Sequence, residues 1–261
     1  MLNKVIFGDA SVVLGKIDSE TIDLVVTSPP YDTLRKYMGT ADDWNKDKFE
    51  TIADELIRVL KPGGVIVWNV NDKVEKGTKT GTSFRQCLYF MDNGLNLNDT
   101  MIWEKTNPCP QVRQPRYTQC FEYMFIFSKG KPKTFNPIMR PCKSAGQYYN
   151  STGKNMGGEN GRKKLCYNVN QEMVDYNIWK IAVAPNREVI NIDGQNIRHP
   201  AVFPYELPYR HIQTWSNEND IVLDPFAGSG TTLVAARDLK RNFIGIEKNA
   251  IYCQLIEKRL S

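Results

Sequence analysis

Hydrophobic positions form two kinds of pattern, and the two alternate at both ends of the chain. Short apolar runs are typical of buried strands, and stripes of apolar residues three and four positions apart are typical of helices. The runs predict strands at 4–7, 22–27, 65–70, 221–224 and 243–247. The stripes predict helices at 49–60, 83–92, 205–215 and 231–239, with a final helix after them. Strands that alternate with helices favour a parallel sheet with helices on both faces.

Two further predictions concern the middle of this pattern. The helix at 49–60 is expected to stop at Lys61–Gly64, because proline lacks an amide donor and glycine permits a turn. The apolar runs at 100–103 and 123–127 predict two strands that pair as an antiparallel edge of the sheet.

Between residues 129 and 198 the alternation fails, and glycine and asparagine accumulate, which predicts a loop-rich insert. From Lys129 to Cys166 the chain holds seven Lys and two Arg against the single acid Glu159, although its net charge is only +5. A basic, tyrosine-containing stretch is typical of a polyanion contact; a solvated loop would carry the same charges.

Composition excludes several classes of protein. With 41% hydrophobic and 24% charged residues, the chain resembles neither disordered, collagen-like nor coiled-coil sequences. No apolar run approaches the roughly 20 residues of a membrane helix, so we expect a cytoplasmic protein with no membrane partner. Its six cysteines form no Cys-x-x-Cys pair and it has two histidines, so we expect no metal and no Ser-His-Asp chemistry.

A glycine-rich loop, Asp224–Thr232, lies where a predicted strand gives way to a helix, which is where open α/β sheets bind ligands. Gly228 and Gly230 would let the backbone approach a ligand, and the helix N-terminus offers amide donors. Glu247 ends the next predicted strand, seventeen positions after Gly230. A carboxylate there suits the two hydroxyls of an adenosine ribose.

The kind of cofactor is indicated by what the loop lacks. No lysine follows the glycines, and Asp224 would repel a pyrophosphate. A carboxylate suits a cationic ligand, so S-adenosylmethionine, which carries a sulfonium and an α-ammonium group, fits better than NAD or ATP. A tight turn without a ligand is the alternative.

A second loop, Thr27–Tyr31, follows the predicted strand 22–27 and contains two prolines. Proline fixes φ, so the carbonyl groups of this loop are rigidly aimed. The Ser28 hydroxyl and the Pro29 carbonyl could accept hydrogen bonds from an exocyclic amine, while Tyr31 stacks on the ring that carries it. A Pro-Pro turn alone is more often structural; beside the glycine loop and Glu247 it indicates a site.

In this order the motifs resemble the DNA amino-methyltransferases of the β arrangement, which are restriction–modification enzymes acting on cytosine N4 or adenine N6. Thr27–Tyr31 matches their catalytic motif and Asp224–Thr232 their cofactor motif. The resemblance implies an α/β fold with a Rossmann-like, seven-stranded, mostly parallel sheet and an antiparallel edge strand. It also implies a catalytic half at 1–128, a basic target-recognition insert at 129–198 and a cofactor-binding half at 199–261.

The resemblance, with the charge pattern, implies roles for individual residues. The predicted catalytic residues are Ser28, Pro29, Pro30 and Tyr31. The predicted cofactor-binding residues are Asp9, His199, Phe203, Asp224, Phe226, Gly228, Gly230, Thr231 and Glu247. The predicted DNA-binding residues are Lys105, Arg140, Lys143, Lys163 and Lys164. Asp9 serves equally well as a helix N-cap, and Trp103, near Lys105, as a core residue.

The predicted activity is methyl transfer from S-adenosylmethionine to the exocyclic amino group of a base flipped out of double-stranded DNA. Serine at position 28 resembles the cytosine-N4 enzymes, whereas aspartate marks the adenine-N6 enzymes. Cytosine N4 is therefore favoured and adenine N6 is the alternative. The oligomeric state, including a homodimer, and a cognate restriction endonuclease as partner stay open.

Two hypotheses come from other classes. A glutamine or RNA methyltransferase would also use a Pro-Pro-Tyr loop, but those relatives usually place it after the glycine motif. A DNA-binding module without activity would explain the basic insert and leave both loops and Glu247 unexplained.

Overall fold

The computed structural model describes residues 2–30, 44–110, 115–151, 165–184, 189–192, 195–198 and 203–261. The chain divides into two compact units, of which the first comprises Met1–Asn136 with Asn177–Ser261 and the second Pro137–Tyr176. No helix in the described part of the chain is long and apolar enough to cross a membrane.

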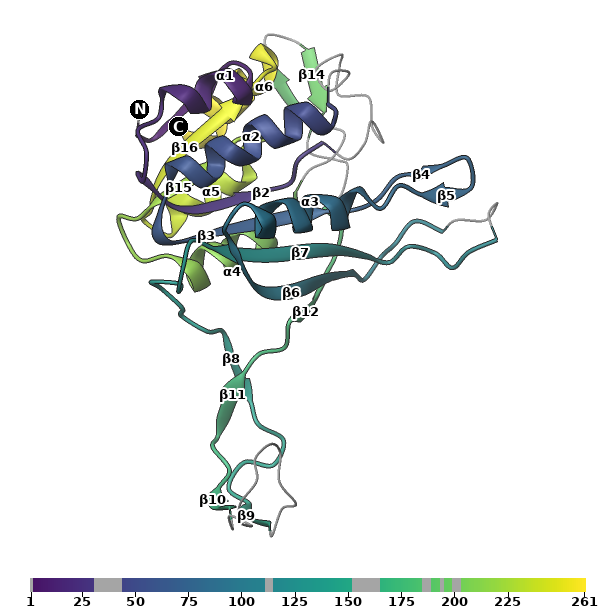
Figure 1. Cartoon of the computed structure of the whole chain (residues 1–261), viewed down its shortest axis with the longest axis vertical. Coiled ribbons are helices and arrows are strands. Elements are labelled where there is room, and N and C mark those ends of the chain that lie inside the picture. Colours follow the sequence, from purple (N-terminus) through teal and green to yellow (C-terminus); the bar gives the residue numbers. More distant parts are fainter. Residues whose placement is uncertain are drawn as a thin grey trace. The chain divides into compact units, whose positions relative to one another are not determined.

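The first unit is built on one eight-stranded sheet (Figure 1). Its strands, in spatial order, are β1 (Lys4–Phe7), β16 (Asn242–Glu247), β15 (Ile221–Asp224), β2 (Ile22–Thr27), β3 (Leu60–Val70), β7 (Phe121–Ser128), β6 (Asn96–Lys105) and β12 (Ile178–Ile181). Neighbours pair in parallel except at β7, which runs antiparallel to both β3 and β6. The predicted mostly parallel sheet is confirmed.

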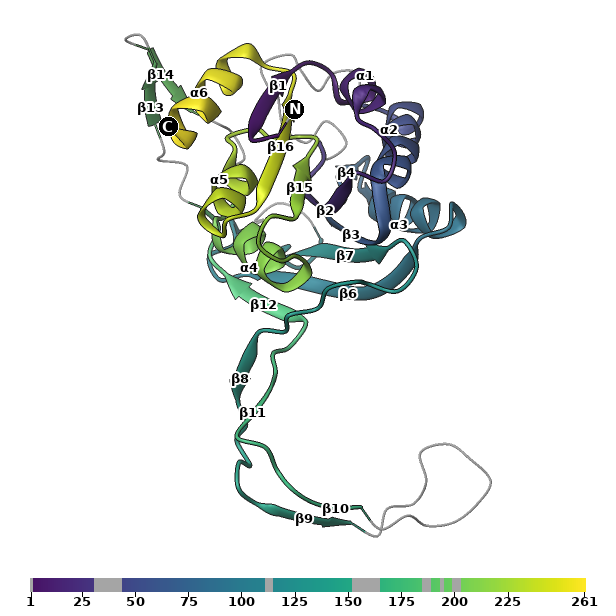
Figure 2. The same ribbon diagram turned by 90° about the vertical axis from the view of Figure 1, so that its left-hand side faces the viewer.

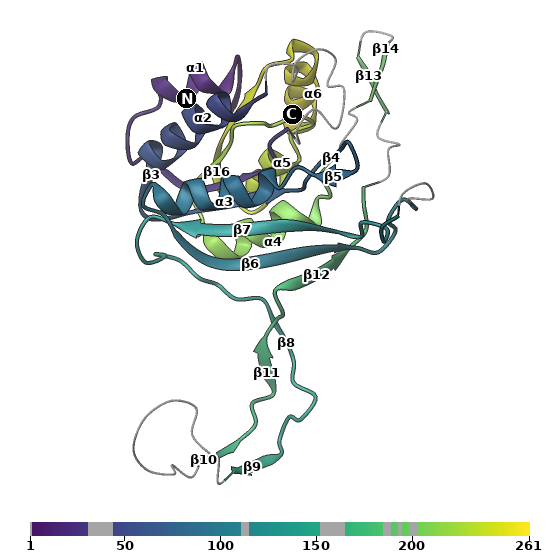
Figure 3. The same ribbon diagram turned by 45° about the vertical axis from the view of Figure 1, so that its right-hand side comes forward.

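The sheet differs from the prediction at its β12 end. It has eight strands rather than seven, and the antiparallel strand β7 lies inside the sheet rather than at its edge (Figure 3). The edge is β12, which comes from the segment predicted to be loop-rich. β12 is four residues long and alternates between exposed and buried positions, a pattern too short to stand out from a loop.

Helices cover both faces of the sheet (Figure 2). One face carries α1 (Ala10–Val13), the 3₁₀ turn Leu14–Lys16, α2 (Lys46–Val59) and α3 (Thr82–Asp92). The other carries α4 (Glu206–Trp215), α5 (Thr231–Asp238) and α6 (Ala250–Leu260). Each predicted helix is present. However, α2 gives way to β3 already at Leu60, so Lys61–Gly64 lies within a strand.

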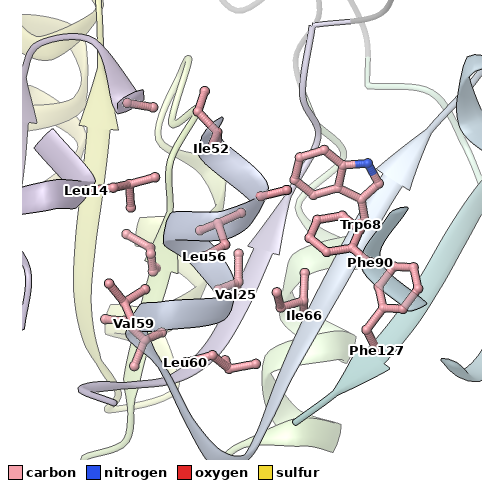
Figure 4. Packing of buried hydrophobic residues seen from close by; sticks show 14 of the residues in the cluster. Leu14, Val25, Ile52, Leu56, Val59, Leu60, Ile66, Trp68, Phe90 and Phe127 are labelled. Atoms are coloured by element: carbon pink, nitrogen blue, oxygen red, sulfur yellow. The ribbon is translucent and has the colours of Figure 1, made fainter. Parts of the chain in front are cut away.

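The core under the first helical layer combines aliphatic and aromatic side chains (Figure 4). Trp68 and Phe90 are fully buried with ring centroids 5.2 Å apart, and Phe90 and Phe127 lie 5.0 Å apart. The aliphatic members shown are Leu14, Val25, Ile52, Leu56, Val59, Leu60 and Ile66. Apolar burial of about 25 cal/mol per Å² makes this layer a main source of stability, and it holds β2 and β3 in place.

The second unit consists of two antiparallel ladders. The first pairs β8 (Met139–Pro141) with β11 (Glu172–Val174), and the other pairs β9 (Tyr148–Ser151) with β10 (Leu165–Asn168). This unit, Pro137–Tyr176, covers fewer residues than the predicted insert, 129–198. Two short hairpins belong to the first unit: β4 (Val74–Glu75) with β5 (Thr78–Lys79), and β13 (Val189–Ile192) with β14 (Gln195–Arg198).

Candidate active site

The two loops that carry the predicted chemistry follow the carboxyl ends of neighbouring parallel strands. β2 and β15 pair in parallel, so the loop after Thr27 and the loop after Asp224 start side by side. The Thr27 hydroxyl donates a hydrogen bond of 2.7 Å to Asp224 Oδ1, and both residues are buried. This bond ties the loop that follows Thr27, called here the serine–proline loop, to the glycine loop that starts at Asp224.

The hydrogen-bond donors to the Asp224 carboxylate come from the protein itself. Its carboxylate accepts hydrogen bonds from the hydroxyls of Thr27 and Thr232 and, at 3.1 Å, from the backbone amide of Phe226. Burial raises the pKa of this carboxyl, and the three hydrogen bonds oppose the rise. Asp224 therefore shapes the start of the loop, and its predicted contact with a ligand ammonium stays a prediction.

The serine–proline loop is packed into the sheet edge. Ser28 and Pro30 are half-buried and Pro29 is buried, and residues 28–30 follow the end of β2 without regular structure. The register pairs Thr27 with Trp68 of β3, so Ser28 lies at the start of a loop flanked by β3 and β15. Tyr31 lies outside the described residues.

The glycine loop needs both glycines for its backbone. Gly228 has φ +54° and Gly230 has φ +78°, the left-handed region that other residues avoid. A Cβ atom on Gly230 would also lie 2.8 Å from Ile256 Cγ1 of α6. Thr231, the first residue of α5, is buried, and its hydroxyl lies 3.2 Å from that of Ser229.

Glu247 ends β16 beside this loop and is 9% exposed. Its Oε2 accepts the amide of Gly228 and its Oε1 the amide of Asn249, each at 2.8 Å. Burial raises the pKa of Glu247 to about 7, against the lowering effect of these amides. Each carboxylate oxygen has two lone pairs, so acceptor capacity remains for the paired hydroxyls of a ribose.

Asp9 follows β1, the strand beside β16. Its carboxylate accepts the Ser11 amide at 3.0 Å, so the N-cap interpretation is confirmed by the geometry. It also accepts Lys48 Nζ at 2.6 Å and Lys248 Nζ at 3.2 Å. These donors hold the pKa of Asp9 far below its usual range despite partial burial, which acts the other way. A contact of Asp9 with the adenine stays a prediction.

The residues present fit S-adenosylmethionine. Asp9, Asp224 and Glu247 end or follow three neighbouring strands, and no lysine or arginine follows the glycines of the loop. Phe226 packs edge-on against Trp44, with ring centroids 5.4 Å apart, and is half-buried. Lys48 and Lys248 pair with Asp9, whereas the hydrogen-bond donors to Asp224 and Glu247 are hydroxyls and backbone amides, so these two carboxylates suit a cationic nucleoside. Phe203, also predicted here, is half-buried ahead of α4, and His199 lies outside the described residues.

The predicted DNA-binding residues have different surroundings. Lys105 Nζ forms a 2.6 Å ion pair with Glu122 and lies 5.0 Å from the Trp103 ring centroid, with 16% of its side chain exposed. The Arg140 guanidinium stacks on Tyr176 at 3.6 Å, and Lys143 is exposed. Lys163 and Lys164 lie outside the described residues.

Trp103 is a core residue: it is 4% exposed and its indole N–H donates to the Ile181 carbonyl at 2.8 Å. Sequence reasoning missed the buried polar groups beside it. Asn69 donates a 2.8 Å hydrogen bond to Glu122, and both are nearly inaccessible. Each is a polar residue inside an otherwise apolar strand, which is the signal that could have found them.

Known proteins resemble this chain over almost its whole length. The family model described as DNA methylase, of the N6/N4 methyltransferase type, matches residues 22–258. The orphan methyltransferase M.BamHII of Bacillus amyloliquefaciens is 47% identical, over 92% of this chain and 89% of that protein. The type II methyltransferase M.HinfI of Haemophilus influenzae is 30% identical, over 99% of this chain and 68% of that protein.

Solved structures share the fold. The PvuII DNA methyltransferase, named as cytosine-N4-specific, superposes with a TM-score of 0.68 at 23% identity, covering 98% of this chain and 85% of that one. The M1.HpyAVI–SAM complex gives a TM-score of 0.62 at 25% identity, covering 99% and 98%. The chain therefore belongs to the N6/N4 DNA methylase family, and it is an S-adenosylmethionine-dependent DNA methyltransferase.

Proposed function

We propose that the enzyme methylates the N4 amino group of cytosine at a specific sequence in double-stranded DNA. The observation that carries the choice of base is Ser28, which stands at the first position of the catalytic motif. The Thr27–Asp224 bond supports the chemistry, because it holds the amine-binding loop against the cofactor loop.

The base must first leave the helix, because pairing hides its amino group, and flipping costs a few kcal/mol. The Ser28 hydroxyl and the Pro29 carbonyl then accept hydrogen bonds from the two N–H groups of the amine. These bonds draw its lone pair out of conjugation with the ring and aim it at the methyl group, which the cofactor supplies. Bound S-adenosylmethionine would supply the methyl group and leave as S-adenosylhomocysteine, and the methylated amine would lose one proton to water.

The rate acceleration then comes from position and electrostatics rather than from a strong base. Pro29 is buried and proline fixes φ, so the loop holds its carbonyl with little reorganisation. Thr27, the last residue of β2 and the neighbour of Ser28, is anchored to Asp224 of β15, which restrains the start of the loop. Together these contacts define where the amine is held.

Adenine N6 is the second candidate, because the family model includes enzymes for both amino groups. The partners of the enzyme are also proposals. A cognate endonuclease is supported by type II relatives such as M.HinfI, whereas M.BamHII is named an orphan methyltransferase. A homodimer and a cytoplasmic location complete the proposal, and sedimentation and cell fractionation test them.

Mass spectrometry of nucleosides tests the target base. DNA incubated with the enzyme and S-adenosylmethionine is digested, and N4-methyldeoxycytidine is the expected product. N6-methyldeoxyadenosine would contradict the cytosine assignment and support the second candidate. An incubation without enzyme gives the background of both nucleosides.

A further inference from the structure

A short arm extends past the carboxyl ends of the strands, where the active-site loops also lie. It consists of residues 73–80, which form the β4–β5 hairpin, and of residues 115–120 beside it. The hairpin follows the end of β3, and Figure 1 shows it continuing past the arrowhead of that strand. Because β2 and β3 run in parallel, the arm and Ser28 leave the sheet in the same direction.

The base of the arm is fixed. The Asp72 carboxylate accepts both the backbone amide and the hydroxyl of Ser83, at 2.9 and 3.0 Å, and Asp72 is 7% exposed. The Thr80 amide donates to the Lys73 carbonyl at 2.9 Å and closes the hairpin. At the tip, Lys76 and Gly77 both have positive φ, as a two-residue type I′ turn requires.

The two segments of the arm are bonded to each other. Arg116 Nη2 donates to the Gly77 carbonyl at 2.7 Å, and Lys79 Nζ donates to Gln119 Oε1 at 2.5 Å. The tip is therefore held by a second layer of chain, which a hairpin of this length needs, because isolated two-stranded hairpins are marginally stable.

The surface of the arm is basic and carries one bare aromatic ring. Its charged residues are Lys73, Glu75, Lys76, Lys79 and Arg116. Lys76 and Lys79 are exposed at and beside the tip. Tyr117 is 99% exposed, although a tyrosine normally buries much of its ring. Basic side chains interspersed with an exposed aromatic ring are typical of nucleic-acid contacts.

We infer that the arm is a second DNA-binding element, separate from the unit Pro137–Tyr176, which grips the duplex beside the flipped base. This inference rests on the proposed action on double-stranded DNA. Lys76 and Lys79 neutralise backbone phosphates, and Tyr117 packs its ring against the nucleotides next to the emptied position. The arm therefore contributes affinity, and it holds the duplex near Ser28.

The lysines are tested by a charge-matched pair of double variants. Lys76→Gln with Lys79→Gln removes two charges from the arm. Lys4→Gln with Lys16→Gln removes two exposed charges near the amino ends of β1 and β2, at the other end of the strands from the arm. Binding to a labelled duplex of mixed sequence is measured by anisotropy over a salt series, because phosphate contacts do not depend on sequence.

The arm variant should flatten the slope of log K against log salt by about 1–2, at about 0.9 per phosphate contact. The control should keep the parent slope, and both variants should bind S-adenosylmethionine as the parent does. Equal slopes for the two double variants would overturn the inference. So would a loss of self-association in the arm variant at an unchanged slope, which would make the arm a protein interface.

Tyr117 is tested by steady-state methylation. Tyr117→Ala should raise the KM for duplex several-fold, whereas Tyr117→Phe, which keeps the ring, should stay within about twofold. An unchanged KM in the alanine variant overturns the role of the ring. The parent enzyme distinguishes this failure from failure of the proposed function: a parent that binds and methylates no duplex refutes both, whereas an adenine product refutes only the target base.

Discussion

Glu247 combines a buried carboxylate with a pKa raised to about 7, above its ordinary value of 4.5. Ribose hydroxyls donate to the ionised form, so binding favours loss of the proton. Affinity for S-adenosylmethionine should therefore be full above pH 7 and fall as the pH drops through that value. Calorimetry across this range measures it.

Glu247→Gln is the control, because glutamine cannot titrate. It should remove most of the pH dependence and weaken cofactor binding by about 1–3 kcal/mol, the range for a lost charged hydrogen bond. A pH dependence that survives in this variant would assign the titration to another group, such as the neighbouring Asp224, whose pKa burial also raises.

Ser28→Ala should abolish most methyl transfer and leave cofactor binding nearly intact. The hydroxyl is proposed to touch the amine and not the cofactor, so its loss acts on the transition state. Single-turnover transfer and calorimetry on the same preparation measure the two effects. Near-normal transfer would remove Ser28 from the mechanism, and weakened cofactor binding would mean that the substitution disturbs the adjoining Thr27–Asp224 bond.

At the scale of the element, sequence pattern predicted the strands at 4–7, 22–27 and 221–224 with their observed bounds. It placed the start of β3 five residues late, because Pro62–Gly64 has the composition of a turn. The stretch bulges out of the pairing with β2, since Ile22 pairs with Leu60 and Leu24 with Val65, and Gly63 has φ +79°. Distant partners keep this bulge in the sheet: Gly63 donates to the Lys129 carbonyl at 2.7 Å, and Lys129 donates to the Gly64 carbonyl at 3.1 Å. Local sequence does not contain such a partner.

The same limit applies to the candidate site. The loop motifs are local, so Ser28, Gly228 and Glu247 could be predicted from spacing alone. The interactions that arrange them are not local. Thr27 and Asp224 are 197 positions apart, and Asp9 meets Lys48 from α2. Only the sheet order brings these groups together, so their partners could not be predicted.

Gly230 couples the glycine loop to α6. Alanine there would have to adopt φ +78° and place its Cβ 2.8 Å from Ile256 Cγ1. We expect Gly230→Ala to lower the free energy of unfolding by about 2–4 kcal/mol, from left-handed backbone strain and overpacking together. Denaturant unfolding measures it.

The matched control is Gly94→Ala, because Gly94 has φ +93° but no heavy atom within 4 Å of the place that a Cβ would take. It should cost only the backbone strain, about 1–2 kcal/mol. Introducing Gly230→Ala into an Ile256→Ala background should cost little more than this part, since both Cγ atoms are removed and only the Cβ of position 256, at 3.3 Å, stays close. Equal costs in both backgrounds would mean that packing against α6 does not select glycine.

At the scale of the molecule, the positive charge and the cofactor residues belong to different parts of the chain. The segment 139–174 holds six Lys and Arg against two acids, whereas every described cofactor-binding candidate lies in the first unit. Phosphate contacts supply affinity without reading sequence, and base contacts supply specificity. The division predicts that removing the second unit weakens DNA binding and leaves cofactor binding unchanged.

The backbone pairing beside β8 and β11 indicates where the second unit can be replaced by a short turn. The Asp175 amide donates to the Ile138 carbonyl at 2.8 Å, the pairing that flanks a two-residue hairpin turn. Replacing residues 139–174 by Asn-Gly should therefore leave a folded first unit that binds S-adenosylmethionine with unchanged affinity. Duplex binding should weaken and lose up to about five units of salt slope, at about 0.9 per contact. If the shortened chain keeps the parent's slope, the basic segment lies off the DNA and the first unit alone binds the duplex.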